Sequence, residues 1–467
     1  MIDPLTDAVH TYLAELVSAF RRTNSPIYVM EHTGWSRGPG NVARRISSNR
    51  PDLGMFPINF REQSVHYQFA IDAIGRDEDY SPALDAMVGD EGDSTRFDAD
   101  TVIDAAMGGI ARSDGSISLR RAEISRRLSR LRQQIRQTET ESIAIIPLPG
   151  LKCYRLPLAL EPGIEIDSLT DDEVSACVSA GVLRPMSDEF PVLSLDECVG
   201  VRIRIKGTSR IVKIKDMETD QAEQLRQLEI ESRRPHRFGD RLRWRLGELT
   251  EDILFVLRLA NPEFLGTHGT VMTTNSVRGT SRTWIGRPTR QFIRTSYEID
   301  QKTAREVRKY WSSLKSQGAK KHSLPAICAR RFNAAMDRGY LDDAVIDYMI
   351  AAEALFLKDS GNPEDRGELG YRLSLRAAHF LGTDTADRQE VLRFMKRAYD
   401  IRSGIAHGKA SVAAVTLPGG SAEIPMSQFV DELGKMMRQS LSKAVQQYPK
   451  DATFGMSEFW DRLILAR

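Results

Sequence analysis

An arginine and a histidine, Arg402 and His407, stand near the end of the chain with four residues between them, where a strongly helical segment runs into Gly404 and Gly408. Arginine carries a permanent positive charge that suits phosphate, and the imidazole of histidine exchanges protons near neutral pH. A nuclease that works without a metal needs these two side chains. Because the chain is rich in arginine and holds eight histidines, such a spacing also arises by chance.

The predicted helices around Arg402 and His407 support a functional role for this pair. The apolar stripe of residues 342–357 includes Glu353, and the stripe of residues 388–402 ends at Arg402. A charge buried alone is costly, so we expect Glu353 and Arg402 to meet in a polar pocket between the two helices. The apolar members of the two stripes are Ile346, Ile350, Leu357, Leu392, Met395 and Tyr399.

The position of His407 depends on how the second helix ends. Five residues turn an unbroken helix by about 140° beyond a full turn, which separates His407 from the face of Arg402. Gly404 offers a break that could bring the histidine back. The alternative is a buried ion pair that fixes helix register, with His407 as a surface residue or a helix cap.

Four segments of this region closely resemble the HEPN superfamily, above all its ApeA-like prokaryotic branch, which occurs in anti-phage and abortive-infection proteins. The resemblance covers residues 320–447 and implies an all-α bundle. Active members of the family are ribonucleases that need no metal, and two chains usually bring their motifs together in one cleft. The segments that carry the resemblance are residues 330–335, 343–356, 373–381 and 398–408.

The resemblance implies a role for each residue of the motif. His407 would move a proton while the 2′-hydroxyl of RNA attacks the phosphate, and Arg402 would stabilise the negative charge of the transition state. Ser403 would orient phosphate or water, and Glu353, which matches the acid of the family's second helix, would hold Arg402. Serine departs from the asparagine or larger polar residue that often follows the arginine in this family.

Two basic groups are candidates for RNA binding. Arg372, Arg376 and His379 recur at helical spacing and could follow an RNA backbone. Residues 233–245 interleave arginines with aromatic residues, as single-stranded nucleic acid binding sites do. For both groups, and for a basic helix at residues 119–137, the alternative is a solvated charged face. The candidates within residues 233–245 are Arg237, Arg241 and Arg243.

The chain as a whole is predicted to be α+β, with a mixed N-terminal region followed by an all-α HEPN-type bundle. We expect an α+β region of unknown role at residues 1–140, a β-containing sensor or regulatory domain at 141–320 and the bundle at 321–467. Loops are expected at residues 34–40 and 76–100, and a hairpin or long loop at 266–290. Residues 201–206 alternate apolar and basic side chains, which predicts a strand with one buried and one positive face.

Composition narrows the class of protein. With 467 residues, 41% of them hydrophobic and 28% charged, the chain has the composition of a soluble globular protein. Its four cysteines show no CxxC spacing and no nearby histidine pair, so neither a metal site nor a cofactor is expected. No long apolar run or targeting segment is visible, and we expect a cytoplasmic protein that does not bind membranes.

The function that these residues and the resemblance favour is a metal-independent endoribonuclease, a toxin-like effector of anti-phage defence controlled by its N-terminal region. Its expected partners are RNA, a second copy of the chain held through the bundle, and a phage-derived trigger or cognate regulatory protein. One alternative is a catalytically inactive HEPN scaffold or nucleotide-binding module, since several family members have lost catalysis. Another is a nucleic-acid-binding regulator that works through the basic segments between residues 120 and 245.

Overall fold

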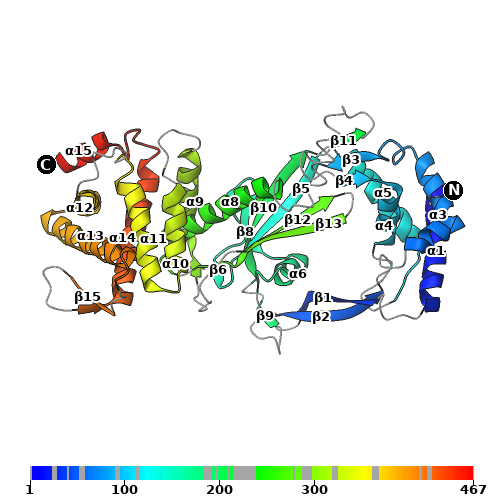
Figure 1. Ribbon diagram of the computed structural model, residues 1–467, viewed down its shortest axis with the longest axis horizontal. Coiled ribbons are helices and arrows are strands. Elements are labelled where there is room, and N and C mark those ends of the chain that lie inside the picture. Colours follow the sequence, from blue (N-terminus) through cyan, green and yellow to red (C-terminus); the bar gives the residue numbers. More distant parts are fainter. Residues whose placement is uncertain are drawn as a thin grey trace.

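The computed structural model is of the α+β class, as the sequence predicts. N-terminal helices lie at one end of the molecule, a β-sheet lies in the middle, and helices form the C-terminal end (Figure 1). No helix in the described parts is long and apolar enough to cross a bilayer. The structure describes residues 3–23, 29–38, 42–51, 58–89, 95–108, 110, 116–137, 139–183, 192–194, 198–208, 210–213, 238–263, 265–276, 279–286, 297–317, 324, 326–359, 368–409, 413–417 and 423–465.

The N-terminal helices enclose a hydrophobic cluster of their own. The helix predicted at residues 119–137 is α5, Arg121–Arg136, and its apolar residues Ile124, Leu128, Leu131 and Ile135 are all buried. This cluster ends where the predicted N-terminal region ends, near residue 140. The other helices of the region are α1, Pro4–Thr23; α2, Ile58–Gln63; α3, Val65–Arg76; and α4, Ala99–Met107.

Several arginines of α5 bind acids within the same region. Arg132 donates hydrogen bonds to Asp77 at 2.6 Å and to Asp3 at 3.2 Å. Arg136 lies 2.6 Å from Asp79. These ion pairs favour the interpretation of α5 as a docked helix with a solvated face over that of an arm that binds nucleic acid.

Two of the predicted loops contain strands. β1, Val29–Gly38, pairs antiparallel with β2, Val42–Pro51, so the prediction of a loop at residues 34–40 is wrong for 34–38. The predicted loop at residues 76–100 also contains two strands and the start of α4. The short strands are β3, Ala86–Gly89; β4, Thr95–Phe97; β9, Val192–Ser194; and β11, Arg210–Lys213. β1 pairs with the strand that follows it, and β3 pairs with β4 and with the distant β11, pairings that local composition does not reveal.

The central sheet has the strand order β13-β12-β5-β10-β8-β7, and its neighbouring strands are antiparallel. Alternate residues of β5 face opposite layers: Ala144 and Ile146 pack with α8, and Ile145 packs with α6. The hairpin that the sequence allowed at residues 266–290 is formed by β12 and β13. The strands of this sheet are β5, Glu139–Pro147; β7, Leu158–Glu161; β8, Ile164–Ser168; β10, Val199–Thr208; β12, Gly269–Ser276; and β13, Gly279–Gly286. A separate two-stranded parallel sheet consists of β6, Leu151–Cys153, and β14, Tyr297–Ile299.

The predicted positive face of β10 is wrong at Arg202. Its side chain is buried and donates hydrogen bonds to Glu173 at 2.8 Å and to Asp167 at 2.9 Å. Glu173 also completes the capping box of Thr170 at the start of α6, Asp171–Ser179. Arg202 therefore fastens α6 to the sheet. Arg204, which follows on the same face, remains exposed.

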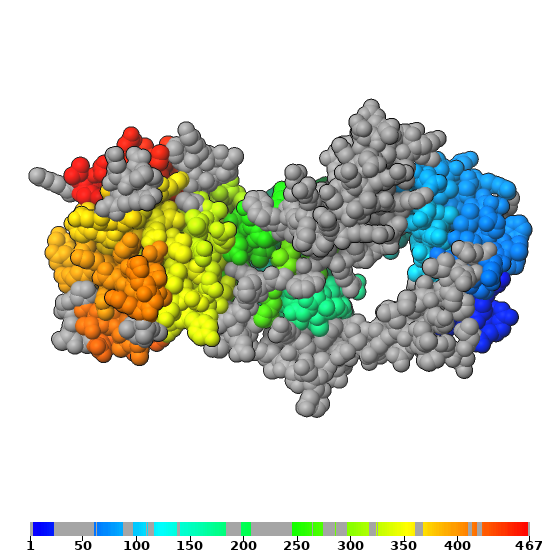
Figure 2. All heavy atoms as spheres, in the orientation of Figure 1, coloured from blue at the N-terminus to red at the C-terminus, as the bar shows by residue number. Residues whose placement is uncertain are grey.

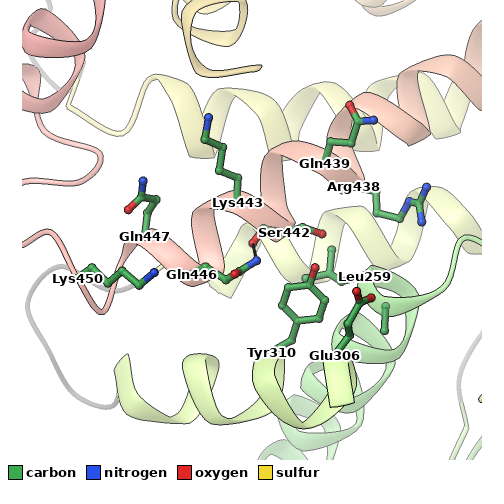
Figure 3. Close-up of a pocket in the computed structure, with 11 residues that line it drawn as sticks. Leu259, Glu306, Tyr310, Arg438, Gln439, Ser442, Lys443, Gln446, Gln447 and Lys450 are labelled. Atoms are coloured by element: carbon green, nitrogen blue, oxygen red, sulfur yellow. Dashed lines mark hydrogen bonds between the residues drawn. The ribbon is translucent and has the colours of Figure 1, made fainter. Parts of the chain in front are cut away.

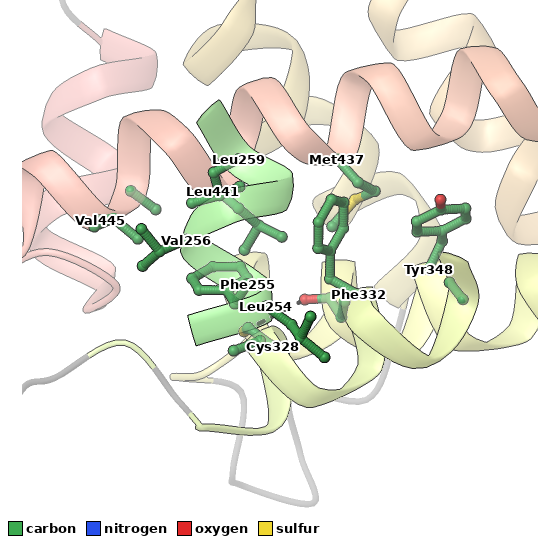
Figure 4. Close-up of a cluster of buried hydrophobic side chains, with 14 of the residues drawn as sticks. Leu254, Phe255, Val256, Leu259, Cys328, Phe332, Tyr348, Met437, Leu441 and Val445 are labelled. Atoms are coloured by element: carbon green, nitrogen blue, oxygen red, sulfur yellow. Dashed lines mark hydrogen bonds between the residues drawn. The ribbon is translucent and has the colours of Figure 1, made fainter. Parts of the chain in front are cut away.

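The C-terminal helices continue the core of the sheet. A hydrophobic cluster extends from β5 through α8 to α14 and α15, so the predicted boundary at residue 320 falls inside a shared core. Figure 4 shows part of it, with Phe255 of α8, Phe332 of α10 and Leu441 of α14 in one cluster, where the ring centroids of Phe255 and Phe332 lie 6.0 Å apart. The elements are α8, Phe238–Ala260; α9, Gln301–Gln317; α10, Ala326–Asp337; α11, Leu341–Phe356; α12, Leu369–Leu381; α13, Thr385–Ala406; β15, Ala414–Thr416; β16, Glu423–Pro425; α14, Met426–Gln447; and α15, Ser457–Leu465.

A buried ion pair joins α8 to α10 within this core. Arg258 of α8 is fully buried, and its Nη2 lies 2.5 Å from Oδ1 of Asp337. Its other donors reach the carbonyl oxygen of Leu265 at 2.7 Å and that of Asn333 at 2.9 Å. The guanidinium is thus surrounded by acceptors, which is the condition under which a buried charge is tolerated.

Candidate functional site

Helices α11 and α13 bring Glu353 and Arg402 together. Nη2 of Arg402 lies 3.5 Å from Oε2 of Glu353 and 3.5 Å from Oε1. Figure 2 shows the yellow and orange surface that these helices share with α12, at the end of the molecule away from the N-terminal helices. The two charged side chains that the apolar stripes predicted to meet are therefore in contact.

The pair lies at the surface of the bundle rather than in its core. The side chain of Glu353 is 27% exposed and that of Arg402 is 29% exposed. Helix α11 is apolar around most of its circumference, so its residues give no single stripe, and the predicted one is half-buried. The fully buried side of α11 consists of Ala344, Val345, Tyr348, Met349, Ala351, Ala352, Leu355 and Phe356.

Among the residues that the structure describes, this contact leaves most of the Arg402 guanidinium available. A separation of 3.5 Å is longer than the about 2.7–2.9 Å that is usual between a guanidinium and a carboxylate. Burial raises the pKa of the Glu353 carboxyl above its ordinary value, and the charge of Arg402 only partly opposes this. Since a guanidinium has five N–H donors, Arg402 can hold Glu353 loosely and still offer donors to a phosphate.

The end of α13 determines where His407 lies. The helix continues through Gly404 to Ala406, so the predicted break at Gly404 is wrong. The turn comes at Gly408, whose φ of +76° suits glycine. The N–H of Lys409 donates to the carbonyl oxygen of Gly404 at 3.0 Å, and this hydrogen bond caps the C-terminal end of the helix.

His407 is the C-cap of this unbroken helix, and its side chain is exposed. Its imidazole therefore leaves the helix on a different side from Arg402, and no hydrogen bond joins the two within the described part of the chain. Ser403, next to Arg402, is half-buried. A single chain thus presents the guanidinium and the imidazole in different directions.

A close approach of α12 and α13 fixes the turn before Arg402. A Cβ atom at Gly370 would lie 2.7 Å from Cδ1 of Tyr399, so only glycine fits there. Tyr399 precedes Arg402 by one helical turn, and the contact therefore supports the position of the arginine. The sequence alone does not indicate the role of Gly370, because a glycine at the start of a helix is too common to indicate a contact.

The predicted RNA-binding stripe on α12 is not an exposed track. Arg376 is buried and binds both oxygens of Asp359, at 2.6 Å and 2.9 Å, and its guanidinium lies 5.4 Å from the centre of the Trp460 ring. Arg372 and His379 are half-buried, and burial lowers the pKa of the His379 imidazole. Arg376 therefore holds the bundle together, and we no longer assign it to RNA binding.

The second predicted RNA-binding group cannot be placed. Arg237 lies outside the described residues. Arg241 and Arg243 belong to α8, but their side chains are not described. The prediction for these arginines therefore stays a prediction.

The side chains at α11 and α13 can perform only a few kinds of chemistry. Arg402 can bind an anion, Ser403 can donate or accept a hydrogen bond, and His407 can exchange a proton. Across the described ranges, no group of three or more His, Cys, Asp or Glu side chains is placed to hold a metal ion. No protein-family model, curated protein or solved structure matches this chain.

Proposed function

We propose that residues 321–467 form a HEPN-like bundle and that the protein is an endoribonuclease that cleaves RNA without a metal. The observation that carries the proposal is the contact between Arg402 and Glu353 at the surface of α11 and α13, where the described residues offer the guanidinium no second hydrogen-bond partner. An exposed imidazole at the end of the same helix supplies the group for proton transfer.

The proposed reaction is an attack of RNA on itself. The imidazole of His407 accepts the proton of the 2′-hydroxyl, and the oxygen attacks the adjacent phosphorus. The bond from phosphorus to the 5′-oxygen breaks, and that oxygen takes up a proton from an acid. The products are a 2′,3′-cyclic phosphate and a 5′-hydroxyl. Arg402 stabilises the added charge on the phosphoryl oxygens, and Ser403 orients the phosphate.

Two chains supply this site. Because Arg402 and His407 leave α13 on different sides, we propose that Arg402 of one chain works with His407 of a second. The half-buried apolar residues Ile346 and Ile350 of α11 lie on the same face as Glu353, and they support a homodimer through this surface. The second imidazole of the dimer can serve as the acid.

The N-terminal region is proposed to control the bundle, as in a toxin-like effector of anti-phage defence with a phage-derived trigger or a cognate regulatory protein. The core that continues from the sheet through α8 into the bundle supports this, as does the ion pair of Arg258 and Asp337. A movement of the sheet would be passed to α10 through these contacts.

The proposed reaction can be tested by comparing RNA with DNA as the substrate. We expect the purified protein to cut single-stranded RNA, with the same rate in excess EDTA, because Arg402 takes the place of a metal at the phosphate. An oligonucleotide of the same sequence with 2′-deoxyribose throughout should stay intact, because it lacks the attacking hydroxyl. Gel electrophoresis of end-labelled strands measures both. Cleavage of the deoxy strand, or loss of RNA cleavage in EDTA, would contradict the proposal.

A second candidate function is a HEPN scaffold without catalysis. It is favoured by the exposure of His407 and by its separation from Arg402 within one chain. In this case the protein would bind RNA or a partner protein and leave RNA intact under the conditions above.

A further inference from the structure

A pocket of about 530 Å³ lies between α8, α9 and α14, on elements that carry neither Arg402 nor His407. Figure 3 shows that α14 forms one wall, and that Tyr310 and Glu306 of α9 stand opposite. The volume is within the range of pockets that hold small ligands, about 300–1,000 Å³. The pocket is lined by Leu259, Ala260, Glu306, Tyr310, Arg438, Gln439, Ser442, Lys443, Gln446, Gln447 and Lys450.

The polar residues of α14 form two neighbouring rows along this wall. Arg438, Ser442 and Gln446 recur at intervals of four residues, and Gln439, Lys443 and Gln447 follow the same spacing one position later. Hydroxyl, amide and guanidinium groups supply many hydrogen-bond donors. In addition, a positively charged side chain lies at each end of the pocket, Arg438 at one end and Lys450 at the other. This arrangement suits an anionic ligand whose oxygen atoms accept hydrogen bonds.

Arg438 is the residue that most needs such a ligand. Its side chain is half-buried, and no carboxylate of the described residues lies within ion-pair distance of it. Burial lowers the pKa of its guanidinium, and Tyr310 and Glu306 only partly oppose this effect. A cation that is partly removed from water without a partner is unfavourable, and a bound anion would remove that cost.

Other residues of the pocket limit what can bind. Lys443 turns away in Figure 3, and its Nζ donates to the carbonyl oxygen of Phe380 at 2.6 Å, so its charge is used elsewhere. Glu306 adds a negative charge opposite α14 and should weaken the binding of any anion. Leu259 and Ala260 supply an apolar surface at the base of the pocket.

We propose that this pocket binds a small phosphate-bearing molecule, with Arg438 at the phosphate, the side chains of Ser442 and Gln446 as further donors, and Lys450 as a second cation at the other end of the pocket. Arginine is well suited to phosphate because its planar fork donates two parallel hydrogen bonds. The phosphate can come from an inorganic ion or from a nucleotide, whose base would lie against Leu259 and Ala260. This proposal does not depend on RNA cleavage.

Isothermal titration calorimetry of the purified full-length protein tests the site, with inorganic pyrophosphate and AMP as separate probes. We expect at least one probe to bind, and Arg438→Gln to weaken that binding by about tenfold or more. Glu306→Gln should strengthen pyrophosphate binding several-fold, because it removes a like charge. Tighter binding of AMP would identify a nucleotide, and tighter binding of pyrophosphate an inorganic anion.

The control is Lys435→Gln, which removes a positive charge from the same helix at an exposed position that pairs with Glu432 at 2.7 Å. It should leave the affinity within about twofold of wild type, since exposed pairs contribute little. If Arg438→Gln does not fold, Gln446→Glu places a carboxylate in the pocket and should weaken binding in the same way. Failure of both probes to bind, or an equal loss in Lys435→Gln, would overturn the proposal.

Discussion

Replacing His407 with alanine is expected to slow RNA cleavage by about 10²–10⁴-fold, the range that a general acid or base contributes. His407 is the C-cap of α13 through its backbone N–H, and its imidazole is exposed, so the loss of the imidazole removes no packing and the free energy of unfolding should change by less than about 0.5 kcal/mol. Single-turnover cleavage of a labelled RNA, with protein in excess, measures the chemical step. Thermal unfolding of the same samples shows whether the fold is kept.

The matched control for this variant is His66→Ala. His66 is also exposed but belongs to α3, in the N-terminal region. We expect the His66 variant to cut RNA at the wild-type rate. Equal cleavage by the His407 variant and wild type would exclude the proposed role of the imidazole, even if the protein is a ribonuclease.

Replacing Asp337 with asparagine is expected to cost about 3–5 kcal/mol of stability, the range found when one member of a buried ion pair is removed. Arg258 has 0% exposed side-chain area, and Asp337 holds its guanidinium at 2.5 Å. The variant leaves a full positive charge inside the shared core of α8 and α10. Denaturation by urea, followed by circular dichroism, should give a clearly lower midpoint.

Asp400→Asn is the control for this second prediction. Asp400 is exposed on α13, so its replacement should change stability by less than about 0.5 kcal/mol. The double variant Arg258→Met with Asp337→Leu removes both charges and should recover much of the loss, because no unpaired charge remains. An Asp337→Asn protein as stable as wild type would show that water or other groups solvate Arg258.

The helices with strong apolar periodicity could be predicted from the sequence. The helix at residues 119–137 is present as α5, and α11 and α13 begin close to the predicted positions, although α13 extends beyond the predicted end at Arg402. The contact between Glu353 and Arg402 also followed from the spacing of apolar residues alone. In each case the signal lies within one helix, where neighbours in sequence are neighbours in space.

Features that depend on distant partners could not be predicted. In the sequence, Arg202 and Arg376 resemble positively charged residues that face solvent. In the structure each side chain is buried and bound to a carboxylate from another element, Glu173 for Arg202 and Asp359 for Arg376. The predicted end of the helix was also wrong. From the sequence, Gly404 and Gly408 are equally plausible positions for the end, and only the backbone hydrogen bonds to the carbonyl oxygens of Gly404 and Ile405 show that the helix continues past Gly404. The presence of a glycine in the sequence does not determine whether a helix ends at that residue or continues through it.

The most direct test of the proposed site is a heterodimer of two inactive chains, one with Arg402→Ala and the other with His407→Ala. With different affinity tags, the mixed dimer can be purified away from both homodimers. If Arg402 of one chain works with His407 of the other, the heterodimer keeps one complete pair of Arg402 and His407 and should cleave RNA faster than either homodimer, but at less than half the wild-type rate because the second imidazole is missing. A heterodimer no more active than either homodimer would contradict a site shared between two chains.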